Sequence, residues 1–204
     1  MMQHVLRAVY PERVVCVLCS RPSRGELLCS HCAQDLEALR LDGTRDRACY
    51  RYEGAAKALI HRLKFDNVTA AATVLARAMS RDVMAMHPAP DTVLTWVTMP
   101  GERRLARGID HGQVLARALG LRLGFPAEKL MDRREEVPQH TQRGLNRAER
   151  LINLRGAFVP RADLPRHILL VDDVFTTGAT METCTQCLRR EGVHVSFITA
   201  AKVV

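Results

Sequence analysis

One run near the C-terminus, residues 168–180, constrains the fold of this chain more than any other feature. It starts with the apolar residues 168–171, passes into Asp172 and Asp173, and ends in the turn Thr-Thr-Gly-Ala-Thr at 176–180. The apolar stretch predicts a buried strand, and the hydroxyl- and glycine-rich turn predicts a connection that opens a helix. In an open α/β sheet, turns of this kind lie at the carboxyl ends of the strands, where ligands bind.

The residue types in this run indicate a phosphorylated sugar as the ligand. Backbone N–H groups, threonine hydroxyls and the amino end of a helix can together surround a phosphate. Gly178 lets the backbone approach the ligand closely because it has no Cβ. Two carboxylates repel a phosphate, but they accept hydrogen bonds from the two hydroxyls of a vicinal diol, directly or through a cation. The run therefore predicts a site for a ribose 5-phosphate.

Other motifs that bind phosphate or contain an acid pair fit less well. The chain has neither the G-x-G-x-x-G fingerprint of dinucleotide-binding sites nor the G-x-x-x-x-G-K-[ST] sequence of a P-loop. The acid pair of a response regulator can also end a strand, but the function of such a site does not require a threonine-glycine turn. A capped strand–helix turn with two surface aspartates remains as the purely structural interpretation.

Residues 1–50 differ from the rest because they hold five of the seven cysteines and only short apolar runs. So small a core needs a cross-link to fold well. Two Cys-x2-Cys pairs, with nine residues between them, can form a tetrahedral Zn²⁺ site in which protein fills all four positions, as in structural sites. Its ligands are Cys16, Cys19, Cys29 and Cys32. Cytoplasmic thiols stay reduced, which favours a metal over disulfides; redox pairs, or His31 in place of one cysteine, are the alternatives.

From residue 50 onward, helical and strand patterns alternate, which is typical of a parallel α/β sheet. The apolar spacing predicts helices over 53–65, 68–86, 108–121 and 180–191, and strands over 92–99, 157–159, 167–171 and 193–203. We therefore expect a zinc-knuckle module in residues 1–50 and an α/β domain in residues 51–204. A third pair, Cys184 and Cys187, falls within a predicted helix and is interpreted as core thiols.

The amino-acid composition favours some classes of binding partner but does not identify one. Lys and Arg number 30 against 22 Asp and Glu, a formal charge of +8, which favours nucleic acid, anionic lipid or phosphate-bearing substrates. Aromatic residues make up only 4% of the chain, which disfavours base stacking on exposed rings. The chain shows no apolar stretch of membrane-spanning length and no signal peptide. We therefore expect a cytoplasmic protein with no membrane insertion.

Residues 168–180 resemble the PRPP-binding motif of type I phosphoribosyltransferases. Together with the preceding four-cysteine motif, they resemble the ComF family of competence-associated, phosphoribosyltransferase-like proteins, over nearly the whole chain. Further matches lie at 63–64, 103–113 and 141–158. The resemblance implies a type I phosphoribosyltransferase-like fold in which Asp172 and Asp173 meet the ribose 2- and 3-hydroxyls. The residues that it implies around the 5-phosphate are Thr176, Thr177, Gly178, Ala179 and Thr180.

The same resemblance implies a reaction, the displacement of pyrophosphate from C1 of PRPP through an oxocarbenium-like state, with Mg²⁺ neutralising the leaving group. Arg103 and Arg104, in the loop after the strand predicted over 92–99, would donate hydrogen bonds to pyrophosphate. A solvated basic helix start is the alternative for these arginines. The charged stretch 131–142 corresponds to the mobile active-site loop of the family, with a plain surface loop as its alternative. The acceptor is not identified by any residue pattern.

Three functions fit this combination: phosphoribosyl transfer, sensing of PRPP or a nucleotide without turnover, and binding of single-stranded DNA. The resemblance also implies a role in DNA uptake during natural transformation, with competence proteins as further partners.

One segment of the chain departs from the family pattern. Where the family reads Arg-Gly-Phe-Asn-Gln, residues 107–111 read Arg-Gly-Ile-Asp-His. Asp110 places a negative charge where a neutral amide is expected, so the acceptor side of the pocket is expected to differ.

Overall fold

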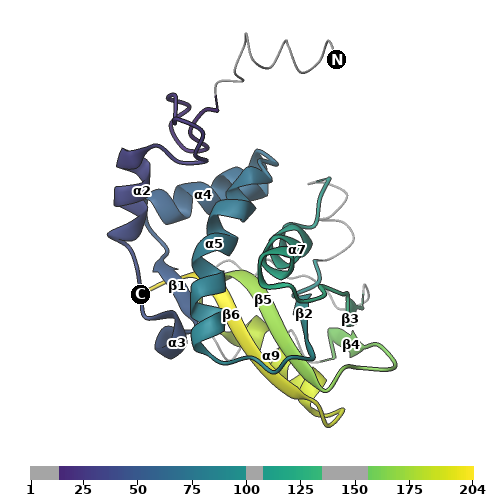
Figure 1. Ribbon diagram of the computed structural model, residues 1–204. Helices are drawn as coiled ribbons and strands as arrows, with labels where there is room; N and C mark the ends of the chain where they lie inside the picture. The colour runs from purple at the N-terminus through teal and green to yellow at the C-terminus, as the bar shows by residue number, and fades with distance from the viewer. Residues whose placement is uncertain (1–13, 100–107, 135–155) are drawn as a thin grey trace, which may run out of the picture.

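The computed structural model describes residues 14–99, 108–134 and 156–204. Its centre is a four-stranded parallel sheet in the order β1-β6-β5-β2 (Figure 1). These strands are β1 (Ala48–Arg51), β2 (Thr92–Trp96), β5 (His167–Phe175) and β6 (His194–Lys202). A separate antiparallel pair consists of β3 (Met131–Arg133) and β4 (Phe158–Pro160). The predicted α/β architecture with a parallel sheet is confirmed.

Helices cover both faces of this sheet because the central strand buries side chains on both sides. Along β5, Leu169 and Val171 join one core cluster, whereas Ile168 and Leu170 join a second one, as the two-residue period of a strand requires. The first cluster lies under α4 (Gly54–Phe65), α5 (Ala70–Ala85) and α7 (His111–Leu123). The second lies under α9 (Ala179–Arg189) and the β3–β4 pair.

The N-terminal cysteine segment packs on the first of these clusters. It continues into α2 (Ser30–Glu37), which packs against α4, and its Val17 and Leu36 belong to the first core cluster. Arg62 of α4 also donates a hydrogen bond to the carbonyl of Val17 over 3.0 Å. The division at residue 50 stays a prediction, while β1 already pairs with β6 from Ala48 onward.

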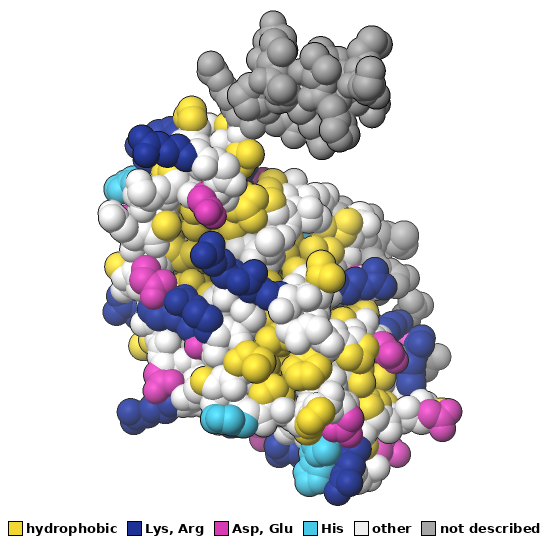
Figure 2. All heavy atoms as spheres, in the orientation of Figure 1, with side chains coloured by type: hydrophobic (Ala, Val, Ile, Leu, Met, Phe, Trp, Pro, Cys, Tyr) yellow, Lys and Arg dark blue, Asp and Glu magenta, His cyan; other side chains and the backbone are white. Residues whose placement is uncertain are grey.

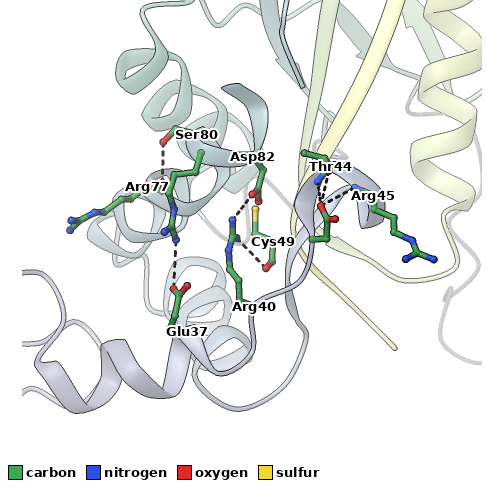
Figure 3. Close-up of polar contacts among 10 residues, drawn as sticks. Glu37, Arg40, Thr44, Arg45, Cys49, Arg77, Ser80 and Asp82 are labelled. Carbon is green, nitrogen blue, oxygen red and sulfur yellow. Dashed lines mark hydrogen bonds and ion pairs between the residues drawn. The ribbon is translucent and has the colours of Figure 1, made fainter. Parts of the chain in front are cut away.

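A buried polar contact holds the segment before β1 against α5 (Figure 3). Arg40 donates to the carboxylate of Asp82 and, over 3.2 Å, to the carbonyl of Cys49. The short helix α3 (Gly43–Asp46) begins here, and a Cβ at Gly43 would overlap the Asp82 carboxylate. Glycine is therefore needed at this position for α3 to pack so closely on α5.

Two of the differences between the predicted and the observed elements have a clear physical reason. The central strand runs to Phe175, four residues beyond the predicted end at 171, because β6 offers pairing partners along its whole length. The stretch predicted as a loop over 131–142 begins instead as a strand, β3, which pairs with β4. Residues 135–142 of that stretch lie outside the described residues. Among the helices of the described residues, none is long and apolar enough to cross a bilayer.

Candidate functional site

The turn that follows β5 leads directly into α9, as the 176–180 pattern predicts. Gly178 precedes the helix with φ +78°, a left-handed conformation that glycine adopts without strain. A Cβ at this position would lie 2.6 Å from Cζ of Phe175. The first N–H groups of a helix have no partners within it and carry a partial positive charge. The turn at the amino end of α9 is therefore built like an anion site at the carboxyl edge of the sheet.

Gly178→Ala is expected to destabilise the protein by about 2 kcal/mol, because the methyl group meets both an unfavourable φ and the Phe175 ring. Gly192→Ala is the matched control, since Gly192 has φ +80° but open space where a Cβ would stand, with nothing within 4 Å. Urea unfolding of both variants separates the clash from the conformational strain. Equal losses in the two variants would show that the contact with Phe175 has no energetic weight.

The two aspartates lie on opposite faces of the sheet, because β5 continues through both of them. Asp173 faces α4, where Nζ of Lys64 lies 2.7 Å from its Oδ1 and both side chains are largely buried. Asp172 accepts the backbone N–H of Asp173 over 2.9 Å. It lines a small cavity of about 40 Å³ together with the turn, including Gly178 and Thr180. The structure thus brings Asp172 together with the turn and places Asp173 against a lysine.

The surroundings of Asp172 change its acidity. Burial raises its pKa to about 7, assisted by the negative charge of Asp173 and opposed by the Lys64 ammonium. Burial lowers the pKa of Lys64, but the charge and hydrogen bond of Asp173 outweigh it and leave the pKa raised. Lys64 is therefore a permanent cation beside the acid pair, while Asp172 changes its charge near neutral pH. In the sequence, Lys64 stood out only because residues 63–64 match the family. No local pattern linked it to Asp173, which lies 109 residues away.

The raised pKa of Asp172 predicts a pH-dependent stability. Between about pH 4, where the carboxyl ionises in the unfolded chain, and pH 7, the folded state keeps a proton that the unfolded state has released. Stabilisation from this group is thus complete below about pH 4 and is lost as the pH rises through 7. We expect wild type to lose stability relative to Asp172→Asn between about pH 4 and 7 in urea titrations. A pH-independent difference between the two proteins would contradict the raised pKa.

The four N-terminal cysteines form a group that could hold a metal ion such as zinc. Their Sγ atoms all lie within 4.8 Å of one another, close to the spacing of about 3.8 Å that tetrahedral Zn²⁺–thiolate geometry requires. Arg21 donates to Sγ of Cys19 over 3.3 Å, and this hydrogen bond lowers the pKa of Cys19 to about 6. A thiolate is the form that binds metal. His31 instead lies 3.5 Å from Asp35, outside this group.

The remaining predicted residues are the two loop arginines, the 131–142 stretch and the third cysteine pair. Arg103 and Arg104 lie outside the described residues. In the 131–142 stretch, the guanidinium of Arg133 stacks over the ring of Phe158 at 5.3 Å. Cys184 is fully buried in the core beneath α9, and Cys187 is half-buried.

Asp110, the residue that departs from the family pattern, has a structural role. It precedes α7, and its Oδ1 accepts the backbone N–H of Gln113 over 3.2 Å. Its Oδ2 accepts Nε1–H of Trp96 at the same distance. Asparagine can cap a helix as well as aspartate, so the added charge is the difference that matters. That charge contributes to the raised pKa of Asp172, which links the departure to the candidate site.

Comparison with known proteins finds relatives named as competence and DNA utilization proteins, although no family model matches the chain. It is 30% identical over 198 residues to the DNA utilization protein YhgH of Escherichia coli O157:H7, covering 91% of this chain and 82% of that protein. The chain belongs to the ComF family. Competence protein F of Haemophilus influenzae is 29% identical over 199 residues, 88% of this chain and 86% of that protein. Competence protein ComFC of Bacillus subtilis is 25% identical over 184 residues, 89% and 74% of the two chains.

Solved structures similar to this ComF family member include UMP synthase from Leishmania donovani, with a TM-score of 0.42 and 16% identity over 71% of this chain and 24% of that one. Orotate phosphoribosyltransferase from Aeropyrum pernix has a TM-score of 0.39 and 19% identity, covering 65% and 59% of the two chains. Structural similarity at this level adds nothing to what the strand order and the family membership already show about the fold.

Proposed function

We propose that this ComF family protein binds PRPP at the carboxyl edge of the sheet and transfers its phosphoribosyl group to an acceptor. The observation that supports the proposal is the junction of β5 and α9. There a half-buried carboxylate, Asp172, and the turn around Gly178 line one small cavity. A turn that donates hydrogen bonds to a phosphate, beside a carboxylate that accepts them from a diol, suits a ribose 5-phosphate, which is the part that PRPP presents.

In the proposed mechanism, the 5-phosphate takes hydrogen bonds from the turn and the first N–H groups of α9. The residues that form this cradle are Thr176, Thr177, Gly178, Ala179 and Thr180. The C1–O bond then breaks, pyrophosphate leaves with the electron pair, and the acceptor forms the new bond to C1. Mg²⁺, when bound, neutralises the leaving pyrophosphate. The ionised Asp172 accepts ribose hydroxyls and stabilises the positive charge that develops on the ring.

Lys64 and Asp173 have a supporting role in this proposal. The ion pair fixes Asp173 against α4 at 2.7 Å, so Asp172 is the acid left to contact the sugar. Removal of the Lys64 charge would raise the pKa of Asp172 further, because the ammonium favours the ionised form of that carboxyl. Arg103 and Arg104 stay as proposed pyrophosphate contacts.

Thermal unfolding with and without Mg²⁺-PRPP tests the binding step. A ligand at 100 times its Kd adds about 2.7 kcal/mol, which corresponds to a rise of roughly 5–10 °C in Tm for a chain of this size. We expect this rise in wild type and in the control Asp163→Asn, which changes an exposed aspartate with a positive φ of 59° that asparagine tolerates. Asp172→Asn should show no rise. An equal rise in all three proteins would exclude Asp172 from the site.

Pyrophosphate release separates transfer from sensing. Transfer predicts pyrophosphate release that needs a suitable acceptor and disappears in Asp172→Asn. A sensor instead shows the Tm rise with no pyrophosphate release, whichever acceptor is added.

The names of the relatives, competence and DNA utilization proteins, support a role in DNA uptake for this chain. Direct binding of single-stranded DNA is the alternative that the +8 charge favours. It predicts an affinity that falls steeply with salt and survives Asp172→Asn.

A further inference from the structure

A second, larger hollow lies at the opposite edge of the sheet. We call it the amino-edge groove, and its polar lining consists mainly of Arg47, His87, His167, Arg189 and His194. Its volume is about 810 Å³, within the range of roughly 300–1,000 Å³ that is usual for small-molecule sites. His167 and His194 are the first residues of β5 and β6. Since β5 extends over nine residues, the groove lies about 26 Å from the turn before α9.

The ionisable side chains that line the groove are those of arginine and histidine. Of the described residues that form it, none is acidic. Two acids next to lining residues have partners of their own: Asp91 bonds His167 over 2.7 Å, and Asp46 pairs with Lys202 over 3.2 Å. Glu191, just after α9, is exposed and does not line the groove. An anion entering the groove therefore meets positive charge without a competing carboxylate in the wall, which favours phosphate or carboxylate ligands.

Arg47 is the residue that points most directly to an anionic ligand. It is half-buried, and among residues 14–99, 108–134 and 156–204 its guanidinium has no hydrogen bond or ion pair, although its backbone carbonyl accepts from Thr199. Arg189 enters the groove from the end of α9, where one nitrogen donates to the carbonyl of Val195 over 2.8 Å. A guanidinium carries five N–H donors and pairs well with phosphate oxygens, so both side chains retain donors for a ligand.

The remaining wall suits a flat ring. The imidazoles of His167 and His194 stack at 5.3 Å with an angle of 13° between their planes, and Asp91 fixes the first of them. Met86, Pro88 and Val193 add apolar surface beside them. Figure 2 shows histidine side chains beside apolar ones at the lower edge of the molecule, below α5 and the amino ends of the strands.

We propose that the amino-edge groove is a second ligand site, which binds a nucleoside 5′-monophosphate. The phosphate pairs with Arg47 and Arg189, and the base lies against the imidazoles and the apolar wall. A phosphate alone would leave most of the 810 Å³ unfilled, whereas a nucleotide uses both the charged and the apolar parts. The site shares no lining residue with the cavity beside Asp172 and so stands independently of the proposed transferase activity.

Isothermal titration with adenosine 5′-monophosphate tests this site on two charge-matched double variants. R47Q/R189Q removes the two groove arginines. R45Q/R190Q removes two exposed arginines from the same segments, neither of which lines the groove. Arg45 extends away from the contacts around Asp82 in Figure 3. We expect binding to weaken at least about tenfold in R47Q/R189Q and to change less than about twofold in R45Q/R190Q.

Equal weakening of nucleotide binding in both double variants would show that the loss comes from the overall charge of the protein, and it would overturn the proposal. Undetectable binding of the nucleotide to wild type would overturn it as well. Adenosine and inorganic phosphate, titrated separately, should each bind at least about tenfold more weakly than the nucleotide. Inorganic phosphate binding as tightly as the nucleotide would overturn the nucleotide assignment. His194→Ala, at an exposed position, provides a second groove variant if R47Q/R189Q does not fold; it should weaken nucleotide binding and leave phosphate binding unchanged.

Discussion

Lys64→Met is expected to destabilise the folded protein by about 3 kcal/mol, since it leaves the largely buried carboxylate of Asp173 without its cation. Methionine keeps most of the length and the apolar stem of lysine, so the loss reports the charge rather than a cavity. Lys57→Met is the matched control because Lys57 lies on the same helix and is exposed. Urea unfolding of the two variants at pH 7.5 measures the difference.

The double variant Lys64→Met/Asp173→Asn completes the test. Neutralising both partners removes the unpaired charge, and we expect it to recover more than half of the stability that Lys64→Met loses. The ion pair would lose its importance if Lys64→Met unfolded within about 0.5 kcal/mol of Lys57→Met. Lys64→Arg keeps a cation beside Asp173 and is expected to lie between the two.

Removal of metal from the four-cysteine group is the second change with a large expected effect. The cysteine segment shares a hydrophobic cluster with the sheet through Val17 and Leu36, so its loss of structure also exposes part of the main core. We expect Cys16→Ser/Cys32→Ser to abolish binding of one zinc ion per chain and to lower Tm by about 10 °C, from a loss of roughly 3 kcal/mol or more.

Elemental analysis of the purified protein and thermal unfolding with a chelator measure these two effects. His31→Ala is the control, because His31 is exposed and pairs with Asp35 rather than with the cysteines. It should keep the full zinc content and nearly the wild-type Tm. Loss of zinc in His31→Ala, together with retention in the double serine variant, would replace the proposed ligand set with one that includes the histidine.

Local patterns in the sequence predicted the parallel sheet and the turn before α9. Such features depend on residues within about ten positions of one another: the apolar run before Asp172, the glycine at 178, and the spacing of the cysteine pairs. The structure confirms the strand–turn–helix order and brings the four cysteine sulfurs together. The full length of β5 was not predictable in this way, because its last four residues extend the strand through the pairing of Asp172, Val174 and Phe175 with β6.

The partner of each aspartate is a matter of tertiary structure. Adjacent carboxylates in the sequence suggest one shared ligand, yet a strand that continues through both turns them to opposite faces. Asp173 then meets a lysine 109 residues earlier in the chain. No spacing rule could connect these two positions, because the contact depends on how α4 packs on the sheet.

By itself, the sequence determined the class of fold, the position of the candidate site after the central strand, and the cysteine set, since all three follow from short-range periodicity and spacing. Only the tertiary structure decided which acid faces the turn and that the cysteine segment shares the main core. It also decided that basic side chains from β5, α9 and neighbouring loops gather in the amino-edge groove. These outcomes depend on contacts between distant segments, and packing of the apolar core sets those contacts.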